Sequence, residues 1–410
     1  MPTDLPGEGY TSHNRARLLR GGQPYFDTLL QCIAGARETI HLQVYIFEKD
    51  ETGNRVWEAL VAAAARGVQV FVLLDGYGSQ HVPAHMIQQF KAAGGRFRWF
   101  EPLLRARNFY FGRRLHHKVA VFDAQAALVG GVNISNRYND LPHYHAWLDW
   151  AVFTEGEAAY ELYGICLDLY NKAGWGKKKF RRYHPPRQLL AVEESIPVRI
   201  RREDWVRSRN EISASYLKVL AAARREVILL SSYFLPGPQM RRALTRAAAR
   251  GVVIKVIAAG KSDVAIAKQA ERYLYRWLLQ SNVLLYEYQA SVLHGKISTA
   301  DGIWTTVGSY NINFISAFAS IELNLELLDS DFAEGLRGQL QEVIEKDCIP
   351  ITTETWLAKD NLWKKMIQRI SYETVRLLFF LFTFYFRQQK QQRRRAKAEG
   401  HKNDGARQAP

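Results

Sequence analysis

Two stretches of the chain repeat the same order of hydrophobic and polar positions. Each begins with a run rich in β-branched and aromatic residues, continues with a segment of helical periodicity, turns at an Arg-Gly pair and ends with a second apolar run. These patterns predict a strand, a helix and a buried strand, which together form a βαβ unit of a parallel sheet. The predicted strands are 40–47, 68–74, 227–234 and 252–257, and the predicted helices are 56–66 and 240–250.

The repetition indicates an internal duplication, so we expect an α/β fold built from two similar domains. The boundary is expected between Gly176 and Arg209, where a basic run at 177–182 and a pair of prolines have the composition of a linker. The 410 residues are therefore divided into a first domain at 1–190, a second domain at 191–350 and a C-terminal segment at 351–410.

Each repeat is followed by the same short motif, a His-x-Lys-x4-Asp sequence with a Gly-x-x-Asn sequence after it. The His and the Lys are two positions apart and so lie on one face of a strand. The glycine-rich bend then brings an asparagine and backbone N–H groups near the same face. The motif residues are His116, Lys118, Asp123 and Asn133 in the first repeat, and His294, Lys296, Asp301 and Asn311 in the second.

These residue types together meet the requirements of phosphoryl transfer. The reaction needs a nucleophile, an acid for the departing oxygen and donors for the charged phosphoryl oxygens. Two histidines, two lysines and two asparagines supply all three without a metal ion, and we expect no cofactor. A single His-x-Lys pair on a strand is usually a surface feature, but two complete motifs with the same extension predict an active site for phosphodiester chemistry.

The two motifs resemble the paired signatures of the phospholipase D superfamily. The resemblance implies a pseudo-two-fold pair of phospholipase D-like α-β-α domains with mixed β-sheets and an active site at their interface. It also implies that one histidine forms a covalent phosphohistidine, that the other protonates the departing alcohol, and that the lysines and asparagines hold the phosphate. We expect His116 to be the nucleophile and His294 the acid, although the near symmetry of the motifs leaves the reverse assignment open.

Other polar residues near the motifs have separate expected roles. Asp123 and Asp301 are members of the catalytic motifs, but we expect them to be structural residues of the turn after each strand. Two further carboxylates, Asp149 and Glu326, follow their motifs at nearly the same spacing. A carboxylate on Nδ1 of each histidine would fix its tautomer and stabilise its cation, which is the role we predict for this pair. The alternative is a surface charge at the end of a strand. His117 should point to the opposite face of its strand and take no part in catalysis.

Charge and composition narrow the choice of partner. The net charge of +16 favours a polyanionic partner, which means nucleic acid or an anionic membrane. Three widely separated cysteines, in no CxxC pair, predict reduced core residues and no metal site. The N-terminus has no apolar region typical of a signal peptide, and no apolar run is long enough to span a bilayer.

The C-terminal segment favours the membrane. Leu362, Trp363, Met366, Ile367 and Ile370 recur at helical spacing with basic residues on the other face, which is typical of a helix that lies in a membrane interface. The apolar, aromatic run 377–386 and a polybasic stretch at 387–397 follow it. The alternative is a helix packed on the core with a solubilising tail.

The overall pattern resembles bacterial cardiolipin synthases of the type that lacks N-terminal transmembrane helices. This resemblance implies transfer of a phosphatidyl group between phospholipids with release of a small alcohol, with phosphatidylglycerol as substrate, by a peripheral enzyme at the cytoplasmic face of the bacterial inner membrane. A hydrolytic phospholipase D has the same motifs and is the main alternative. A nuclease suits the charge but not the aromatic C-terminal segment, so we expect no nucleic-acid partner. A catalytically silent membrane scaffold conflicts with two intact motifs.

Overall fold

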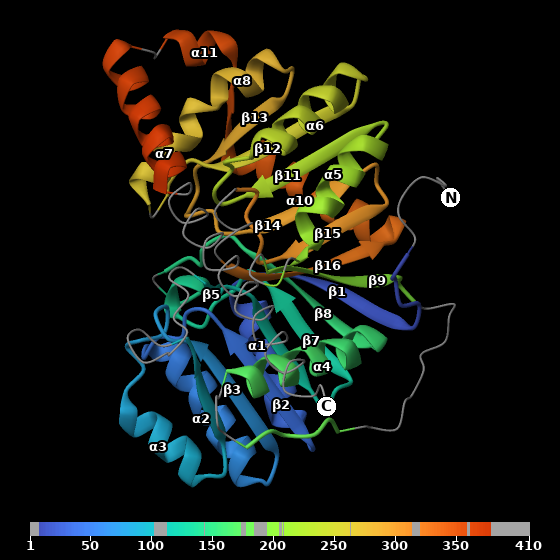
Figure 1. Ribbon diagram of the computed structural model, residues 1–410, viewed down its shortest axis with the longest axis vertical. Helices are drawn as coiled ribbons and strands as arrows, with labels where there is room; N and C mark the ends of the chain where they lie inside the picture. The colour runs from blue at the N-terminus through green and yellow to red at the C-terminus, as the bar shows by residue number, and fades with distance from the viewer. Residues whose placement is uncertain are drawn as a thin grey trace, which may run out of the picture.

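The computed structural model describes residues 8–101, 113–142, 144–173, 178–183, 195–204, 207, 209–262, 264–313, 320–358 and 361–378. Two halves lie one above the other along the longest axis, each with a central sheet flanked by helices (Figure 1). The first half is blue to green in that view and the second is yellow to red.

The first half is built on a seven-stranded sheet in the order β1-β8-β7-β6-β2-β3-β4. One face packs on three helices and the other on a single long helix. The strands are β1 (Asn14–Arg20), β2 (Thr39–Val44), β3 (Gln69–Asp75), β4 (Arg96–Phe100), β6 (Lys118–Phe122), β7 (Ala126–Gly130) and β8 (Trp150–Gly156). The helices are α1 (Gln23–Gly35), α2 (Glu51–Ala65), α3 (Ala84–Ala92) and α4 (Glu157–Lys172), with the 3-10 helix η1 (Asn136–Tyr138) before β8.

The second half contains a ten-stranded sheet that is joined at one point by the first half. Its main order is β10-β9-β16-β15-β14-β11-β12-β13-β17. The tenth strand, β5 (Arg114–Leu115), comes from the first half and pairs in parallel with the beginning of β16. The strands are β9 (Val198–Asp204), β10 (Arg209–Asn210), β11 (Glu226–Ser231), β12 (Val253–Ala259), β13 (Leu284–Tyr288), β14 (Lys296–Ala300), β15 (Trp304–Gly308), β16 (Ser320–Leu328) and β17 (Cys348–Ile351). The helices are α5 (Glu211–Ala222), α6 (Pro238–Ala249), α7 (Ala265–Tyr273), α8 (Tyr275–Gln280), α10 (Ser330–Asp347) and α11 (Thr353–Ala358).

The two sheets have the same topology, which confirms the predicted pair of mixed α/β units. The order β9-β16-β15-β14-β11-β12-β13 repeats that of the first sheet strand for strand. β2 pairs with β3 in parallel, and β11 pairs with β12 in parallel, as the βαβ pattern predicts. The strands that carry the motifs, β6 and β14, are antiparallel to β2 and β11. The domain limits at 190 and 350 stay predictions.

Local sequence explains the ends of the crossover helices. The carboxylate of Asp50 accepts a hydrogen bond from the backbone N–H of Gly53 and so caps the first turn of α2. After α2 and after α6 the chain reverses at Gly67 and Gly251, whose φ angles of 93° and 90° are readily adopted by glycine. The Arg-Gly turns of the sequence are therefore helix C-terminal caps that redirect the chain into β3 and β12.

The halves share one hydrophobic core. The largest cluster of buried apolar side chains contains Leu148 and Trp150 from the first half together with Leu293 and Ile297 from the second. These residues lie beside both sequence motifs, so the packing that joins the halves also fixes the two motifs relative to each other.

The chain ends, within its described part, in a helix at 362–378 that lies against α7 (Figure 1). No helix in the described part of the chain combines the length and the apolar character needed to cross a bilayer. The three cysteines are not bonded to one another. The aromatic run that was expected to continue to residue 386, and the basic tail after it, lie outside the described residues apart from 377 and 378.

Candidate active site

The two motif histidines lie two residues before the beginnings of equivalent strands, His116 before β6 and His294 before β14. Their backbones are held by the opposite half of the molecule. The N–H groups of His116 and of the next residue both donate to the carbonyl of Ile321, at 3.0 and 2.9 Å. The N–H groups of His294 and of the next residue both donate to the carbonyl of Leu148, at 2.8 Å each. Each half thus positions the motif of the other.

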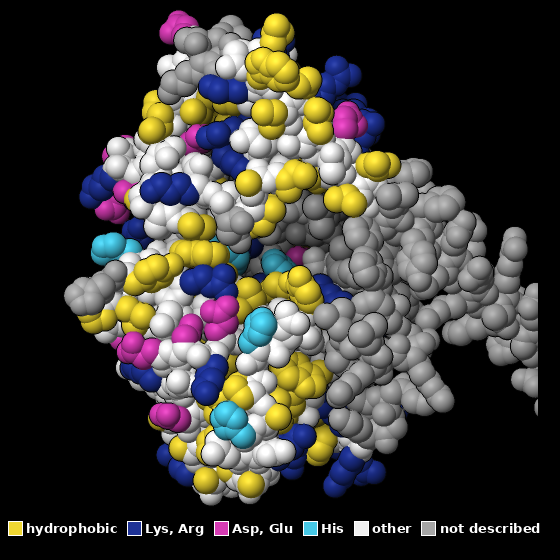
Figure 2. All heavy atoms as spheres, turned by 90° about the vertical axis from the view of Figure 1, so that its left-hand side faces the viewer, with side chains coloured by type: hydrophobic (Ala, Val, Ile, Leu, Met, Phe, Trp, Pro, Cys, Tyr) yellow, Lys and Arg dark blue, Asp and Glu magenta, His cyan; other side chains and the backbone are white. Residues whose placement is uncertain are grey.

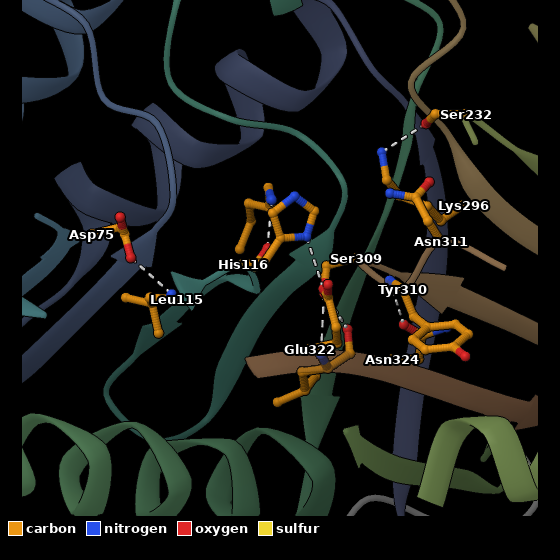
Figure 3. A network of polar contacts seen from close by, with 12 residues as sticks. Asp75, Leu115, His116, Ser232, Lys296, Ser309, Tyr310, Asn311, Glu322 and Asn324 are labelled. Carbon is orange, nitrogen blue, oxygen red and sulfur yellow. Dashed lines mark hydrogen bonds and ion pairs between the residues drawn. The ribbon is translucent and has the colours of Figure 1, made fainter. Parts of the chain in front are cut away.

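The residue after each of these carbonyls supplies the carboxylate that orients the histidine. Glu322 Oε2 lies 2.9 Å from His116 Nδ1, and Asp149 Oδ2 lies 2.6 Å from His294 Nδ1. The hydroxyl of Ser309, from the second Gly-x-x-Asn sequence, donates to Glu322 Oε2 at 2.5 Å (Figure 3). Because Nδ1 of each ring is hydrogen-bonded to a carboxylate, Nε2 is the ring nitrogen that is available to react with a substrate.

The prediction that Glu326 orients a histidine is wrong. Glu326 Oε2 accepts from Nε of Arg199 at 3.0 Å and lies 3.7 Å from Nε of Arg201, so it belongs to a buried ion pair within the second sheet. The equal-spacing argument failed because the two connections differ in length. Residues 131–149 join β7 to β8 and include η1, whereas residues 309–319 join β15 to β16. The residue equivalent to Asp149 is therefore Glu322.

The two motif lysines are both buried but have different surroundings. Nζ of Lys296 donates to the hydroxyl of Ser232 at 2.9 Å and lies 3.0 Å from Nδ1 of His294. Nζ of Lys118 donates to the backbone carbonyl of His116 and lies 5.5 Å from the centre of the Tyr45 ring. Each lysine donates to the backbone carbonyl of its own histidine, so the two-residue spacing brings the ammonium group next to that residue.

Burial and the clustered positive charges keep the histidines uncharged. Burial lowers the pKa of His116, although the negative charge of Glu322 opposes that shift. Burial together with Lys296 and Lys118 lowers the pKa of His294 well below its usual value. Burial also lowers the pKa of Lys118 to about 7. At neutral pH both rings are therefore neutral imidazoles, and Lys118 is poised near its titration point.

The two carboxylates differ in protonation. Burial tends to raise the pKa of Glu322, but the neighbouring His116, Lys118 and Ser309 outweigh it, so this pKa lies below the usual value. Burial raises the pKa of Asp149 to about 7 despite the nearby Lys296. Glu322 is therefore ionised at neutral pH, while Asp149, beside the neutral ring of His294, is partly protonated.

The motif aspartates lie at the far ends of the strands from the histidines. Asp123 accepts three backbone N–H groups from residues 37–39 at the start of β2, and Asp301 accepts three from residues 224–226 at the start of β11. Both have positive φ angles, 51° and 54°. This arrangement agrees with the structural role expected for them and places them outside the group that surrounds the histidines.

The two asparagines lie beside the cluster in different settings. The side chain of Asn133 accepts from the backbone N–H of Ile46 at 3.1 Å and donates to the hydroxyl of Tyr138 at 2.9 Å. The side chain of Asn311 points toward Lys296 and accepts from the hydroxyl of Ser231 at 3.5 Å (Figure 3). Phosphate binding by either asparagine remains a prediction.

Several site residues were not found from the sequence. Tyr45 packs on His116 with ring centres 5.1 Å apart, and Tyr138 packs edge-on to His294 at 5.0 Å. Ser232 directly follows β11, just as Tyr45 directly follows β2. Aligning the two repeats in the sequence would therefore have pointed to both positions as equivalent residues near the site. His117 behaves as expected, since its ring is buried against Gln43 at 2.9 Å, away from the cluster.

The site opens on one face of the molecule. Figure 2 shows a hollow between the two halves, with histidine and acidic side chains inside it. Among the described residues, no group of three or more His, Cys, Asp or Glu side chains is placed to hold a metal ion. The cluster described above contains two neutral histidines, two carboxylates and two lysines, which is a set suited to transferring a phosphoryl group through a histidine.

Comparison with known proteins supports this interpretation. The sequence model for the family "Cardiolipin synthase, PLD-like domain" matches residues 29–151 and 216–344, one match in each half. Cardiolipin synthase B of Escherichia coli K12 is 34% identical over 366 residues, which cover 88% of each chain. Cardiolipin synthase 1 of Bacillus anthracis is 28% identical over 367 residues, covering 86% of this chain and 70% of that protein.

The same fold occurs in solved structures of low sequence identity. The crystal structure of phosphatidylserine synthase from Haemophilus influenzae superimposes with a TM-score of 0.70 at 12% identity, covering 91% of this chain and 96% of that one. Fold and motifs define a protein with two phospholipase D-like domains. The chain belongs to the cardiolipin synthase family of the phospholipase D superfamily and is an enzyme of that superfamily.

Proposed function

We propose that this protein is a cardiolipin synthase-type phosphatidyltransferase, which moves a phosphatidyl group from one phospholipid to a hydroxyl of another through a phosphohistidine. The observation that carries the proposal is the reciprocal pair of histidine–carboxylate contacts across the interface, His116–Glu322 and His294–Asp149. The names of the relatives support the lipid substrate class, since two of them are cardiolipin synthases from different bacteria.

The protonation states favour His116 as the nucleophile. Ionised Glu322 accepts a hydrogen bond from Nδ1–H of His116. This contact leaves a lone pair on Nε2, and the carboxylate stabilises the positive ring that forms on attack at phosphorus. His294 has the opposite arrangement, because Nδ1 faces the ammonium of Lys296 and the carboxyl of Asp149. Both groups can donate to Nδ1, so Nε2 of His294 carries the proton that an acid needs.

The reaction then has two balanced steps. In the first, Nε2 of His116 forms a bond to phosphorus while the bond to the leaving oxygen breaks. His294 gives its Nε2 proton to that oxygen, which departs as an alcohol, and takes the proton of Asp149 on Nδ1, so that its ring stays neutral. In the second, Nε2 of His294 takes the proton of the acceptor hydroxyl, whose oxygen attacks phosphorus as the bond to His116 breaks, and Nδ1 returns its proton to Asp149. Lys118, Lys296, Asn133 and Asn311 are proposed to hold the phosphate oxygens.

The proposed substrate is phosphatidylglycerol, as both donor and acceptor, with glycerol as the released alcohol. The enzyme would work at an anionic membrane surface, as a peripheral protein on the cytoplasmic face. The net charge of +16 supports that partner, because basic side chains near a surface are attracted to anionic headgroups.

The first test is incubation of the purified protein with phosphatidylglycerol followed by separation of the lipid products. We expect cardiolipin and free glycerol. Phosphatidic acid without cardiolipin would identify a hydrolytic phospholipase D, and degradation of DNA without lipid turnover would identify a nuclease. His116→Ala and His294→Ala should each reduce turnover about 1,000-fold or more.

The second test assigns the nucleophile. Brief reaction with phosphatidylglycerol labelled with ³²P, then acid-free quenching and peptide mapping, should recover the label on the peptide that contains residue 116. His294→Ala should retain some labelled intermediate, because it loses the acid and not the nucleophile, whereas His116→Ala should retain none. Label on residue 294 alone would reverse the assignment.

A further inference from the structure

The helix at 362–378 presents an unusually apolar outer face. Its exposed apolar side chains include Leu362, with 83% of its surface accessible, and Trp363, with 72%. Placed on a helix of 3.6 residues per turn, the exposed apolar residues fall within one arc, which also contains Thr374 and Glu373, and the carboxylate of Glu373 is paired with Arg376 at 2.9 Å. They are Leu362, Trp363, Met366, Ile367, Ile370, Leu377 and Leu378, which we call the apolar arc.

The opposite face of the helix is fixed to the protein, so the arc cannot turn inward. Tyr372 and Val375 are buried in a small cluster with Leu235, Ala270 and Leu274. The Tyr372 ring also stacks on Tyr273 of α7, with ring centres 4.8 Å apart. A helix that merely completed the core would bury its most apolar side, and here that side faces outward.

Basic residues flank the apolar arc. Lys364, Lys365, Arg369 and Arg376 are all exposed on the same helix. On the helical wheel, Arg369, Arg376 and Lys365 follow one edge of the arc and Lys364 lies beyond the other. An apolar face bordered by lysine and arginine is the arrangement that lets a helix lie in the headgroup region of an anionic bilayer.

The arc lies on the side of the molecule that carries the active site. The helix occupies the upper left of Figure 1, and Figure 2 views that side directly, with hydrophobic side chains grouped on its upper part and the hollow below them. Val264 and Ile266, next to and within α7, are also exposed, to 41% and 43%. A flat partner that covered the arc would therefore also face the hollow.

We propose that the helix at 362–378 docks on an anionic phospholipid bilayer through its apolar arc and thereby turns the active-site hollow toward the membrane. This inference deepens the proposed function, on which it rests for the identity of the substrate. The positive flanks distinguish a bilayer from a second copy of this chain, because two copies meeting through this face would bring like charges together.

The test compares two double variants of the full chain. Trp363→Gln/Ile367→Gln removes two exposed residues of the arc, and Val253→Gln/Leu284→Gln is the matched control. The control residues are exposed to 44% and 45% at the beginnings of β12 and β13, the strand ends away from Ser232 and the site. Because all four residues are exposed, we expect the four substitutions to leave folding intact.

Binding is measured by sedimentation with vesicles of phosphatidylglycerol and phosphatidylcholine. The arc variant should bind about tenfold or more weakly, while the control should match the wild-type protein. Lys365→Gln/Arg369→Gln should weaken binding at low salt and have little effect at high salt. Equal binding by the arc variant and wild type would overturn the proposal.

Two further measurements separate the alternatives. Sedimentation velocity without lipid should give the same oligomeric state for wild type and arc variant, whereas a dimer that the variant dissociates would show that a second copy covers the arc. Turnover of phosphatidylglycerol dispersed in detergent should be unchanged in the arc variant. If the wild-type protein bound vesicles but made no cardiolipin under either condition, the proposed function would fail while the docking surface would stand.

Discussion

Glu322 and Glu326 lie on the same face of one strand, are equally buried, and have opposite roles. Glu322 meets His116, and Glu326 meets Arg199. The partner, not the residue type or its burial, decides which of them belongs to the active site.

Glu322→Gln should therefore reduce kcat about 100-fold with little change in Tm, because the neutral amide cannot stabilise a positive His116 ring. Glu326→Gln should instead leave the Arg199 charge buried without its partner and lower the unfolding free energy by about 3–5 kcal/mol. Steady-state kinetics and thermal unfolding of both variants check this contrast. Equal losses of kcat with equal Tm values would contradict it.

The pH dependence of kcat/KM should have its alkaline limb near pH 7. As the pH rises through about 7, Lys118 loses the charge that attracts the phosphodiester and Asp149 loses the proton it shares with His294. Lys118→Arg keeps its charge at every accessible pH, so its alkaline limb should be shallower than that of the wild type. A profile that stays flat from pH 6 to pH 9 would show that neither group controls the rate.

Ser232 is a positioning residue for Lys296. Ser232→Ala should lower kcat about tenfold, since a hydrogen bond to a charged group contributes about 1.5–3 kcal/mol and its loss lets the ammonium move off His294. Ser232→Thr keeps the hydroxyl and should recover most of the rate, as measured by lipid turnover. If Thr were as slow as Ala, the hydroxyl would not be the group responsible.

At the scale of the element, β2 contains one residue, His41, that lowers the stability of the fold. His41 is fully buried between Phe71 and Tyr163, and neither ring nitrogen has a hydrogen-bond partner among the described residues. Burial lowers the pKa of His41 to about 3 from 6.5. The unfolded chain binds a proton at this residue at a higher pH than the folded chain, so stability is full above about pH 6.5 and declines as the pH falls toward 3.

His41→Phe should raise the unfolding free energy at pH 7 by about 1–3 kcal/mol, because it removes two buried polar atoms and keeps the ring stacking. It should also flatten the loss of stability between pH 6.5 and 4. Denaturant unfolding at several pH values measures both effects. His85→Phe, on an exposed position of α3, is the control and should change neither.

The sequence predicted the repeated elements well because apolar periodicity is a local property. The expected strand at 40–47 ends at Val44 in the structure, and that at 227–234 ends at Ser231. The overshoot has a physical cause, since the residues after each strand pack in the loops beside the site, where Ser232 is buried and Tyr45 is half-buried. Contacts between distant segments carry no such local pattern, which is why Glu322 was missed and Asp149 was found without its partner histidine.

At the scale of the whole molecule, the two halves work as one catalytic unit. Each histidine takes its backbone support and its carboxylate from the opposite half. The predicted duplication accounts for the two motifs, but this exchange could not be read from either repeat alone.

Asp149→Asn combined with Glu322→Gln tests this unity. Because the proposed mechanism uses both histidines in the same step, the double variant should be hardly slower than the slower single variant, rather than showing the product of the two losses. Lipid turnover by the four proteins of the cycle provides the measurement. Multiplicative losses would mean that the two pairs act independently.

The exchange between halves also bears on how such a protein can diverge. In a dimer of two identical subunits, each histidine would meet a carboxylate of the other subunit, and both carboxylates would have to be the same residue type. Joining the halves in one polypeptide removes that constraint, and here the equivalent positions have separated into Asp149 and Glu322, and into Tyr45 and Ser232. Covalent fusion therefore permits the two otherwise matching histidines to differ, as the proposed roles of attack by one and proton transfer by the other require.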